Sequence, residues 1–207
     1  MPTILLPAGG SVPMTDFASL SSGVSLWLHR SDLADVIPSF ISLAEERMNR
    51  ALRVRAMEVT LSETEIASGS ITAPSDTVGV KSLWIVGYER SPLKSQSFDF
   101  IKMRGTEGVP GYFAWQGDRF HFDGSGTVTG VLYEKIPSIS SANSTNWLLT
   151  SHPSAYLHGA LVQACIYLRD EPGIAFHEAA FADALSDIAN TDMRDRYGSG
   201  PLQVRAR

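Results

Sequence analysis

The sequence predicts an α+β protein: a helical bundle from the N- and C-terminal segments, a central antiparallel β insertion and an extended C-terminal tail. Apolar residues recur with helical spacing from residue 37 to residue 52. Between residues 58 and 137, short β-leaning runs alternate with Gly, Pro, Ser and Asp, and helical spacing returns after residue 151. The expected parts are a flexible N-terminus (1–14), a helical body (15–57 and 151–197), a β-rich insertion (58–137) and a tail (198–207).

The N-terminal helical region is expected to hold two helices. Thr15 can cap the first, which Ser21, Ser22 and Gly23 weaken. Pro38 suits the first turn of the second helix, because its missing N–H is not needed there. The apolar stripe of this second helix comprises Ile37, Phe40, Ile41, Ala44, Met48, Ala51 and Leu52.

The opposite face of the second helix is crowded with polar and charged side chains. It carries Glu45, Glu46, Arg47, Asn49, Arg50 and Arg53. Such a face is either the solvated outside of a core helix or a surface for another protein subunit, and the sequence leaves both interpretations open.

In the β insertion, Gly117-Asp118 is expected to form a tight hairpin turn. This turn would place Phe113 and Trp115 opposite Phe120 and Phe122 across the two strands. Strands are expected at 58–61, 70–73, 80–86, 112–116, 119–123 and 127–135, with a brief helix at 97–103.

After the insertion, residues 138–150 are rich in Ser, Asn and Thr and should form a loop. Pro153 opens a helix, residues 170–173 break the chain, and a last helix follows, so the two helices would pack as a hairpin. The segment after Tyr197, GSGPLQVRAR, is expected to be a flexible tail that docks elsewhere.

Composition excludes several classes of protein. A net charge of -5 argues against bulk electrostatic binding to nucleic acid. The single cysteine, Cys165, cannot form an internal disulfide, which fits a reducing compartment, and it is expected to be a buried apolar residue. No segment approaches the roughly 20 apolar residues that cross a bilayer, so no membrane contact is expected.

The sequence contains partial matches to metal-binding and phosphate-binding motifs, but none of these motifs is complete. His177-Glu178 starts like a zinc protease helix, but Phe181 stands where the second histidine is needed. His177 is expected to pack beside the apolar stripe instead. Gly124-Ser125-Gly126 connects two strands rather than opening a helix, so it is expected to be a hairpin turn and not a phosphate loop. We therefore expect no enzymatic activity, no cofactor and no metal.

Several short stretches of sequence between residues 15 and 202 are loose packing patterns when taken singly. Their order along the chain is more specific for one protein family than any single stretch is. They are Trp27–Leu33, Ile37–Ile41, Leu43–Arg47, Leu52–Glu58, Tyr133–Pro137, Asn146–Leu149, His152-Pro153, Tyr156-Leu157, Gly159–Leu161, Tyr167–Asp170 and Arg196–Gly198. In this order they resemble the head-to-tail adaptor, or connector, proteins of tailed bacteriophages and prophages, especially the short-tailed kind.

The resemblance implies a non-enzymatic protein of the virion neck, made in the host cytoplasm, that forms a ring, commonly of twelve copies, beneath the portal protein. The helical body would surround the channel through which DNA passes, without sequence-specific binding, and the ring would receive a tail nozzle or tail tube protein. Contacts to these partners and to neighbouring copies are expected at Glu45, Glu46, Arg47, Arg50, Arg53, Leu202, Val204, Arg205 and Arg207.

Two other functions remain open at this point. One is a phage-associated hydrolase whose site is assembled only in space. The other is a small DNA-binding or packaging accessory protein that uses Arg47, Arg50 and Arg53 on phosphates.

Overall fold

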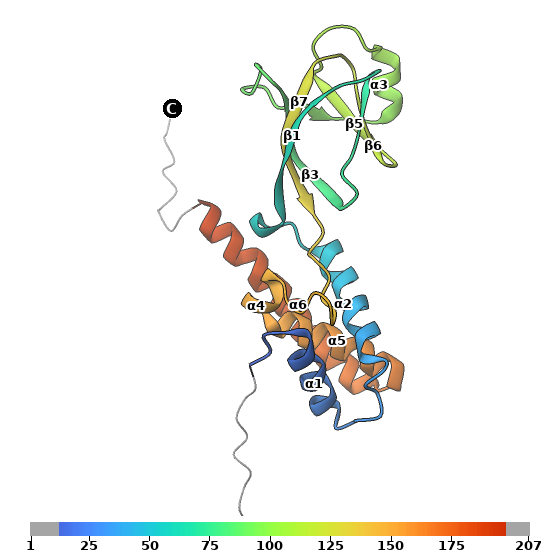
Figure 1. Cartoon of the computed structure of the whole chain (residues 1–207), viewed down its shortest axis with the longest axis vertical. Helices are drawn as coiled ribbons and strands as arrows, with labels where there is room; N and C mark the ends of the chain where they lie inside the picture. Colours follow the sequence, from blue (N-terminus) through green and yellow to red (C-terminus); the bar gives the residue numbers. More distant parts are fainter. Residues whose placement is uncertain (1–12, 198–207) are drawn as a thin grey trace, which may run out of the picture. The chain divides into compact units, whose positions relative to one another are not determined.

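The computed structural model describes residues 13–197. The chain divides into two compact units, one comprising Met1–Leu52 and Ile136–Arg207 and the other Arg53–Lys135. We call the described parts of these the helical unit and the β unit (Figure 1). The expected tail at 198–207 lies outside the described residues, as does most of the expected flexible N-terminus.

The helical unit is built around one central helix. Its helices are α1 (Phe17–Leu28), α2 (Ile37–Ala51), α4 (Trp147–Ser151), α5 (Pro153–Leu168) and α6 (Glu171–Tyr197). Helix α5 packs against each of the other four. Its buried side chains therefore lie on nearly every side of the helix rather than along one stripe.

The predicted apolar stripe of α2 is confirmed over most of its length. Ile37, Phe40, Ile41, Ala44 and Met48 are buried, and Pro38 lies in the first turn. The stripe differs from the prediction at its end, where Ala51 is exposed.

The N-cap of helix α1 lies one residue later than expected. The N-cap is Asp16 and not Thr15, because Asp16 and Ser19 form a reciprocal pair of hydrogen bonds. The Asp16 carboxylate accepts from the Ser19 N–H at 2.7 Å, and the Ser19 hydroxyl oxygen accepts from the Asp16 N–H at 3.0 Å.

The C-terminal helices differ from the expectation at two boundaries. The expected loop at 138–150 contains the start of α4, which Asn146 caps by accepting a hydrogen bond from the Leu149 N–H. The chain break is shorter than predicted: Arg169, in the left-handed conformation, ends α5, and α6 already begins at Glu171. Pro172 fits the first turn of α6, where no N–H is required.

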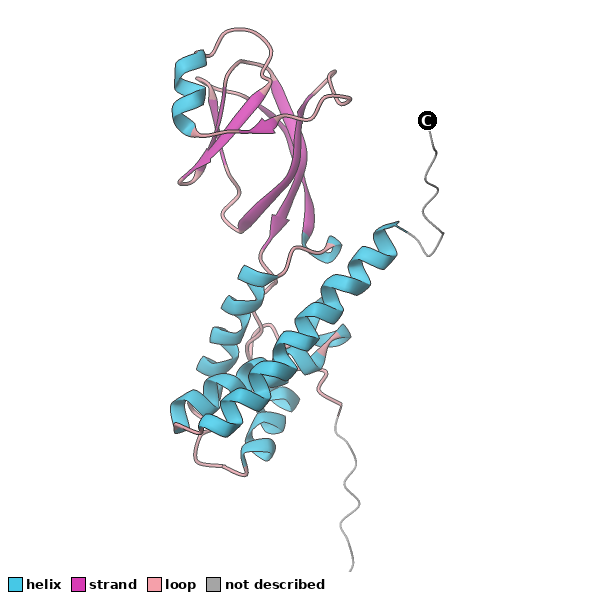
Figure 2. Cartoon of the chain, turned by 180° about the vertical axis from the view of Figure 1, so that it is seen from behind, coloured by secondary structure: helices cyan, strands magenta, loops and turns pink. Residues whose placement is uncertain are grey.

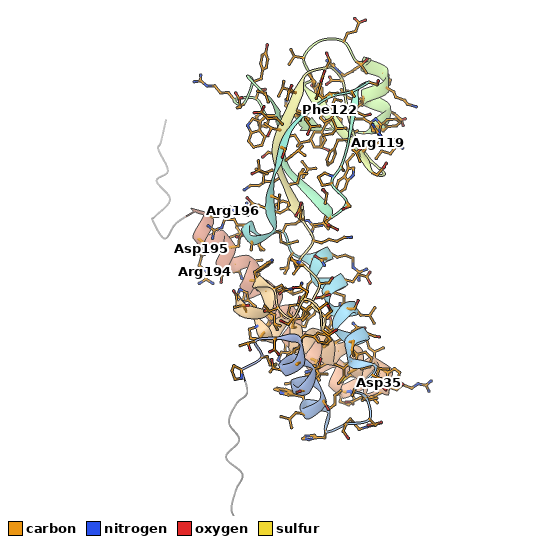
Figure 3. The ribbon with its side chains drawn as sticks, viewed as in Figure 1. Asp35, Arg119, Phe122, Arg194, Asp195 and Arg196 are labelled. Atoms are coloured by element: carbon orange, nitrogen blue, oxygen red, sulfur yellow. The ribbon has the colours of Figure 1, made fainter. Side chains whose placement is uncertain are left out.

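Helices α5 and α6 pack against each other, as predicted, and Cys165 on α5 is buried. Two cations, Arg194 and Arg196, lie in the last turn of α6, where they oppose the negative end of the helix dipole (Figure 3).

The β unit contains all the strands of the described chain (Figure 2). They are β1 (Glu58–Glu65), β2 (Ser70–Thr72), β3 (Thr77–Ile85), β4 (Lys94–Ser95), β5 (Tyr112–Gln116), β6 (Arg119–Phe122) and β7 (Thr127–Glu134), with the short helices η1 (Arg55–Met57) and α3 (Phe98–Arg104). One sheet has the order β1-β7-β3 and the other β2-β6-β5-β4. Pairing is antiparallel except between β4 and β5.

The predicted hairpin at Gly117-Asp118 is confirmed. Phe113 pairs with Phe122 and Trp115 with Phe120, whose ring centroids lie 5.5 Å apart. Phe120 and Phe122 are fully buried and join residues of both sheets in one apolar core. Phe122 is labelled in Figure 3. The brief helix predicted at 97–103 is also present, as α3, capped by Ser97.

The expected hairpin turn at Gly124-Ser125-Gly126 is wrong. These residues connect β6 to β7, which belong to different sheets and do not pair with each other. The segment is therefore a crossover between the two sheets, which glycine-rich sequence alone does not distinguish from a hairpin turn.

Candidate functional site

The charged face predicted for α2 separates in the structure into a buried part and an exposed part. Glu45, expected on that exposed face, is only 4% exposed, so the expectation for this residue is wrong. Glu46 and Arg50 are exposed, and Arg47 is half-buried.

The buried Glu45 carboxylate has partners from two distant segments of the chain. Its Oε1 atom accepts a hydrogen bond from the Ile139 N–H at 2.8 Å and another from the Tyr156 hydroxyl at 3.0 Å. The Tyr156 oxygen in turn accepts from the Asn146 amide at 2.6 Å. These bonds satisfy polar groups that burial would otherwise penalise, and they fix α2 against α5 and the segment before α4.

Burial shifts the pKa values of both Glu45 and Tyr156. Burial raises the pKa of Glu45 above its usual range, although the hydrogen bonds from Ile139 and Tyr156 act in the opposite direction. Burial also raises the pKa of the Tyr156 hydroxyl, and the neighbouring carboxylate adds to that effect. Tyr156 therefore acts as a hydrogen-bond donor and not as an acid.

Asn49 anchors the same region one turn further along α2. Its Oδ1 atom accepts a hydrogen bond from the Ile136 N–H at 2.8 Å. The polar side chains at 45 and 49 thus hold the residues at which the chain re-enters the helical unit.

Arg47 forms an ion pair with a residue of a neighbouring helix. Its guanidinium donates two hydrogen bonds to the carboxylate of Glu178 on α6, at 2.5 and 2.9 Å, and lies 4.9 Å from the centroid of the Phe181 ring. The hydrogen bonds raise the pKa of Arg47 and lower that of Glu178. Arg47 therefore connects α2 to α6 within the helical unit.

The remaining exposed residues of α2 form a compact surface. We call Leu43, Glu46 and Arg50 the outer face of α2, since their spacing places them on one side of the helix. Leu43 is 47% exposed, and Arg50 donates to Glu46 at 2.7 Å as an i,i+4 ion pair. The two charged residues of this face were predicted from the sequence, whereas Leu43 was missed, although its position among the charged residues is visible in the sequence.

The other candidate interface residues do not join this surface in the structure. Arg53 follows the end of α2 and belongs to the β unit, where it donates a hydrogen bond to the Val78 carbonyl at 2.8 Å. Leu202, Val204, Arg205 and Arg207 lie outside the described residues.

His177, expected beside the apolar stripe of α6, lies next to His158 of α5 and Trp27 of α1. Within residues 13–197 there is no cluster of three or more His, Cys, Asp or Glu side chains arranged to hold a metal ion. No helix of that same span is long and apolar enough to cross a membrane.

Comparison with known proteins bears on the role of these surfaces. The SU10 adaptor protein family matches residues 15–205, nearly the whole chain. The chain belongs to the SU10 adaptor protein family. The chain is therefore a structural protein of a bacteriophage, a head-to-tail adaptor, as the sequence resemblance predicted. A search of curated proteins found no match.

Membership in the SU10 adaptor family implies association with portal and tail proteins and a place in the neck of the virion. The family is structural rather than enzymatic. The surfaces described above are accordingly considered as binding surfaces.

Proposed function

We propose that this adaptor protein assembles into a closed ring between the portal and the tail, commonly of twelve copies, with DNA passing through its channel without sequence-specific binding. Synthesis in the host cytoplasm would precede incorporation into the virion neck, where a tail nozzle or tail tube protein would bind the ring. The family match over residues 15–205 carries this proposal.

A ring built from one kind of subunit needs two different contact surfaces on each copy, because its contacts are head-to-tail. The outer face of α2 is our candidate for the first. It offers an exposed apolar side chain, Leu43, beside the exposed ion pair of Glu46 and Arg50. Since an exposed pair contributes little to the stability of the chain itself, both charges can re-pair with a neighbouring copy at small cost.

Our candidate for the second surface lies on α1 and α6. Trp27 is 49% and Phe176 is 64% exposed, and both rings contact the imidazoles of His158 and His177. Large apolar side chains gathered at the surface are typical of protein interaction sites. We call Trp27 and Phe176 the aromatic surface.

Charge reversal on the outer face of α2 tests the first contact. The variant Arg50→Glu should weaken ring formation on the portal, because it reverses a charge of the proposed contact with a neighbouring copy. It also places two like charges beside each other at 46 and 50 of the same helix. The double variant Glu46→Arg/Arg50→Glu restores the intrahelical pair, so it separates helix stability from binding. Arg90→Glu, an equal change of charge at an exposed residue of the β unit, is the matched control.

The assignment of the outer face is wrong if Arg50→Glu and the double variant both form the ring like the parent at physiological salt. Loss of the ring in both variants, with the melting temperature unchanged, supports it. Loss in the Arg90→Glu control as well would show that the effect is one of net charge.

We further propose that Leu202, Val204, Arg205 and Arg207 contact the portal or a neighbouring copy, and that Arg47 and Arg53 serve mainly to hold their own units together. Deleting residues 198–207 should leave the melting temperature of the chain unchanged and weaken its binding to the portal. A truncated chain that melts well below the parent would contradict this division of roles.

A further inference from the structure

Two histidines on different helices meet at the side of the helical unit. The Nδ1 atoms of His158 on α5 and His177 on α6 lie 3.1 Å apart, and the two rings are tilted by 32°. Both side chains are half-buried. When both imidazoles are neutral, one Nδ1–H donates to the other Nδ1, so the pair shares a single proton.

The surroundings favour the neutral form of both rings. Trp27 and Phe176 contact both imidazoles, with centroid separations between 5.1 and 6.5 Å. Burial lowers the pKa of His158 and of His177, so both are unprotonated bases at neutral pH. The charge of Asp170 acts on His177 in the direction that favours a cation.

We propose that His158 and His177 form a two-histidine site for a divalent transition-metal ion such as Zn²⁺ or Ni²⁺. Neutral imidazole is the protein ligand that these ions most often take. For the ion to bind both Nδ1 atoms, which are already held close together, the ring that carries Nδ1–H would change to its Nε2–H tautomer, so that both imidazoles remain neutral ligands.

The spacing of the two nitrogens matches this coordination. Two metal–nitrogen bonds of about 2.1 Å place their nitrogens roughly 3.0 Å apart at the angle of about 90° that Ni²⁺ prefers, and roughly 3.4 Å apart at the angle of about 109° in tetrahedral zinc. The observed 3.1 Å lies between these two values. Since no third His, Cys, Asp or Glu joins the pair in the described part of the chain, water would complete the shell. The site would bind more weakly than a closed structural zinc site.

A bound ion would connect α5 to α6 directly beneath Trp27 of α1. Because these side chains do not converge in an unfolded chain, the ion would bind the folded state and raise its stability with concentration. The site does not depend on ring formation, so it can be tested on the isolated chain.

The test is a calorimetric titration of the full-length chain, without an affinity tag and after chelator treatment, with Zn²⁺ and separately with Ni²⁺. We expect one ion per chain, a rise in melting temperature at saturation, and weaker binding as the pH is lowered, because protons compete for the imidazoles.

Variants locate the site. His158→Gln and His177→Gln should each weaken binding at least about tenfold, since even outer residues of metal sites contribute this much. His121→Gln and His152→Gln are controls and should bind like the parent. The melting temperature without metal shows whether each variant is folded, and the pH dependence of the parent tests the proposal without any substitution.

No saturable binding up to about 1 mM metal would overturn the proposal. So would binding that survives both His158→Gln and His177→Gln, or that the two control substitutions weaken equally.

Discussion

The Tyr156 hydroxyl donates a hydrogen bond to the Glu45 carboxylate across 3.0 Å in the interior of the helical unit, although the two residues are 111 positions apart in the sequence. This bond joins the central helix α5 to α2. Because the same carboxylate oxygen accepts from the Ile139 N–H, the charge at position 45 belongs to the core and not to a binding surface.

Removing the Glu45 acceptor should destabilise the chain. Glu45→Ala leaves the Ile139 N–H and the Tyr156 O–H without this partner, which should lower the free energy of unfolding by about 2–4 kcal/mol. Glu45→Gln keeps an oxygen for both donors and removes a buried charge, so it should stay within about 1 kcal/mol of the parent. Urea unfolding monitored by circular dichroism measures both. An alanine variant as stable as the parent would contradict the described network.

The raised pKa of Glu45 makes the parent chain less stable, relative to Glu45→Gln, as the pH rises. The folded state holds the proton at pH values where the unfolded state, with the ordinary pKa near 4.3, has lost it. The contribution of Glu45 to the free energy of unfolding is therefore fully present below its ordinary pKa. It is lost as the pH rises through the pKa of Glu45 in the folded state. Urea unfolding of both chains at a series of pH values from about 4 upward measures the difference. A constant difference would show that the pKa is not raised.

The sequence predicted those elements of the fold that depend on residues near one another in the chain. The stripe of α2, the hairpin at Gly117 and the helix capped by Ser97 each follow from periodicity or from a turn residue. The early start of α6 was missed because Pro172 breaks a helix interior but suits a first turn.

The candidate site was predictable only in part. Glu46 and Arg50 are exposed as charged helix residues usually are. Helical spacing places Glu45 four residues after Ile41 and three before Met48, on the buried side of α2, but an acidic side chain was not expected there. Its partners Ile139 and Tyr156 could not be predicted, because they are about a hundred residues away in the sequence.

Strand β7 should not tolerate a side chain at Gly130. This strand lies between β1 and β3, and a Cβ atom at Gly130 would come 2.3 Å from the Ser82 carbonyl oxygen and 2.7 Å from a methyl group of Leu83. Gly130→Ala should therefore lower the free energy of unfolding by about 1–3 kcal/mol. Gly117→Asn is the control, because its Cβ meets no atom within 4 Å and asparagine tolerates the positive φ of this turn. Equal stability of the two variants in thermal unfolding would refute the close approach.

Losing Arg47 should weaken the helical unit moderately. Arg47→Ala removes the two hydrogen bonds to Glu178 and the contact with the Phe181 ring, but Glu178 is 45% exposed and water screens the pair. We expect a loss of roughly 1–2 kcal/mol in urea unfolding, from the ion pair and the ring contact together. Added salt should reduce the difference in the free energy of unfolding between the parent and Arg47→Ala. A difference that grows with salt would argue against the ion pair.

The mass of the complex between this chain and the portal protein of the same phage tests the central claim most directly. Native mass spectrometry of the purified full-length chain alone should give a monomer or small oligomers, because closure is expected only on the portal. Mixed with portal, the chain should give a single complex with a fixed number of copies, twelve if the ring follows the family resemblance. A chain that stays separate from the portal, or binds it without a fixed number of copies, would contradict the proposed ring.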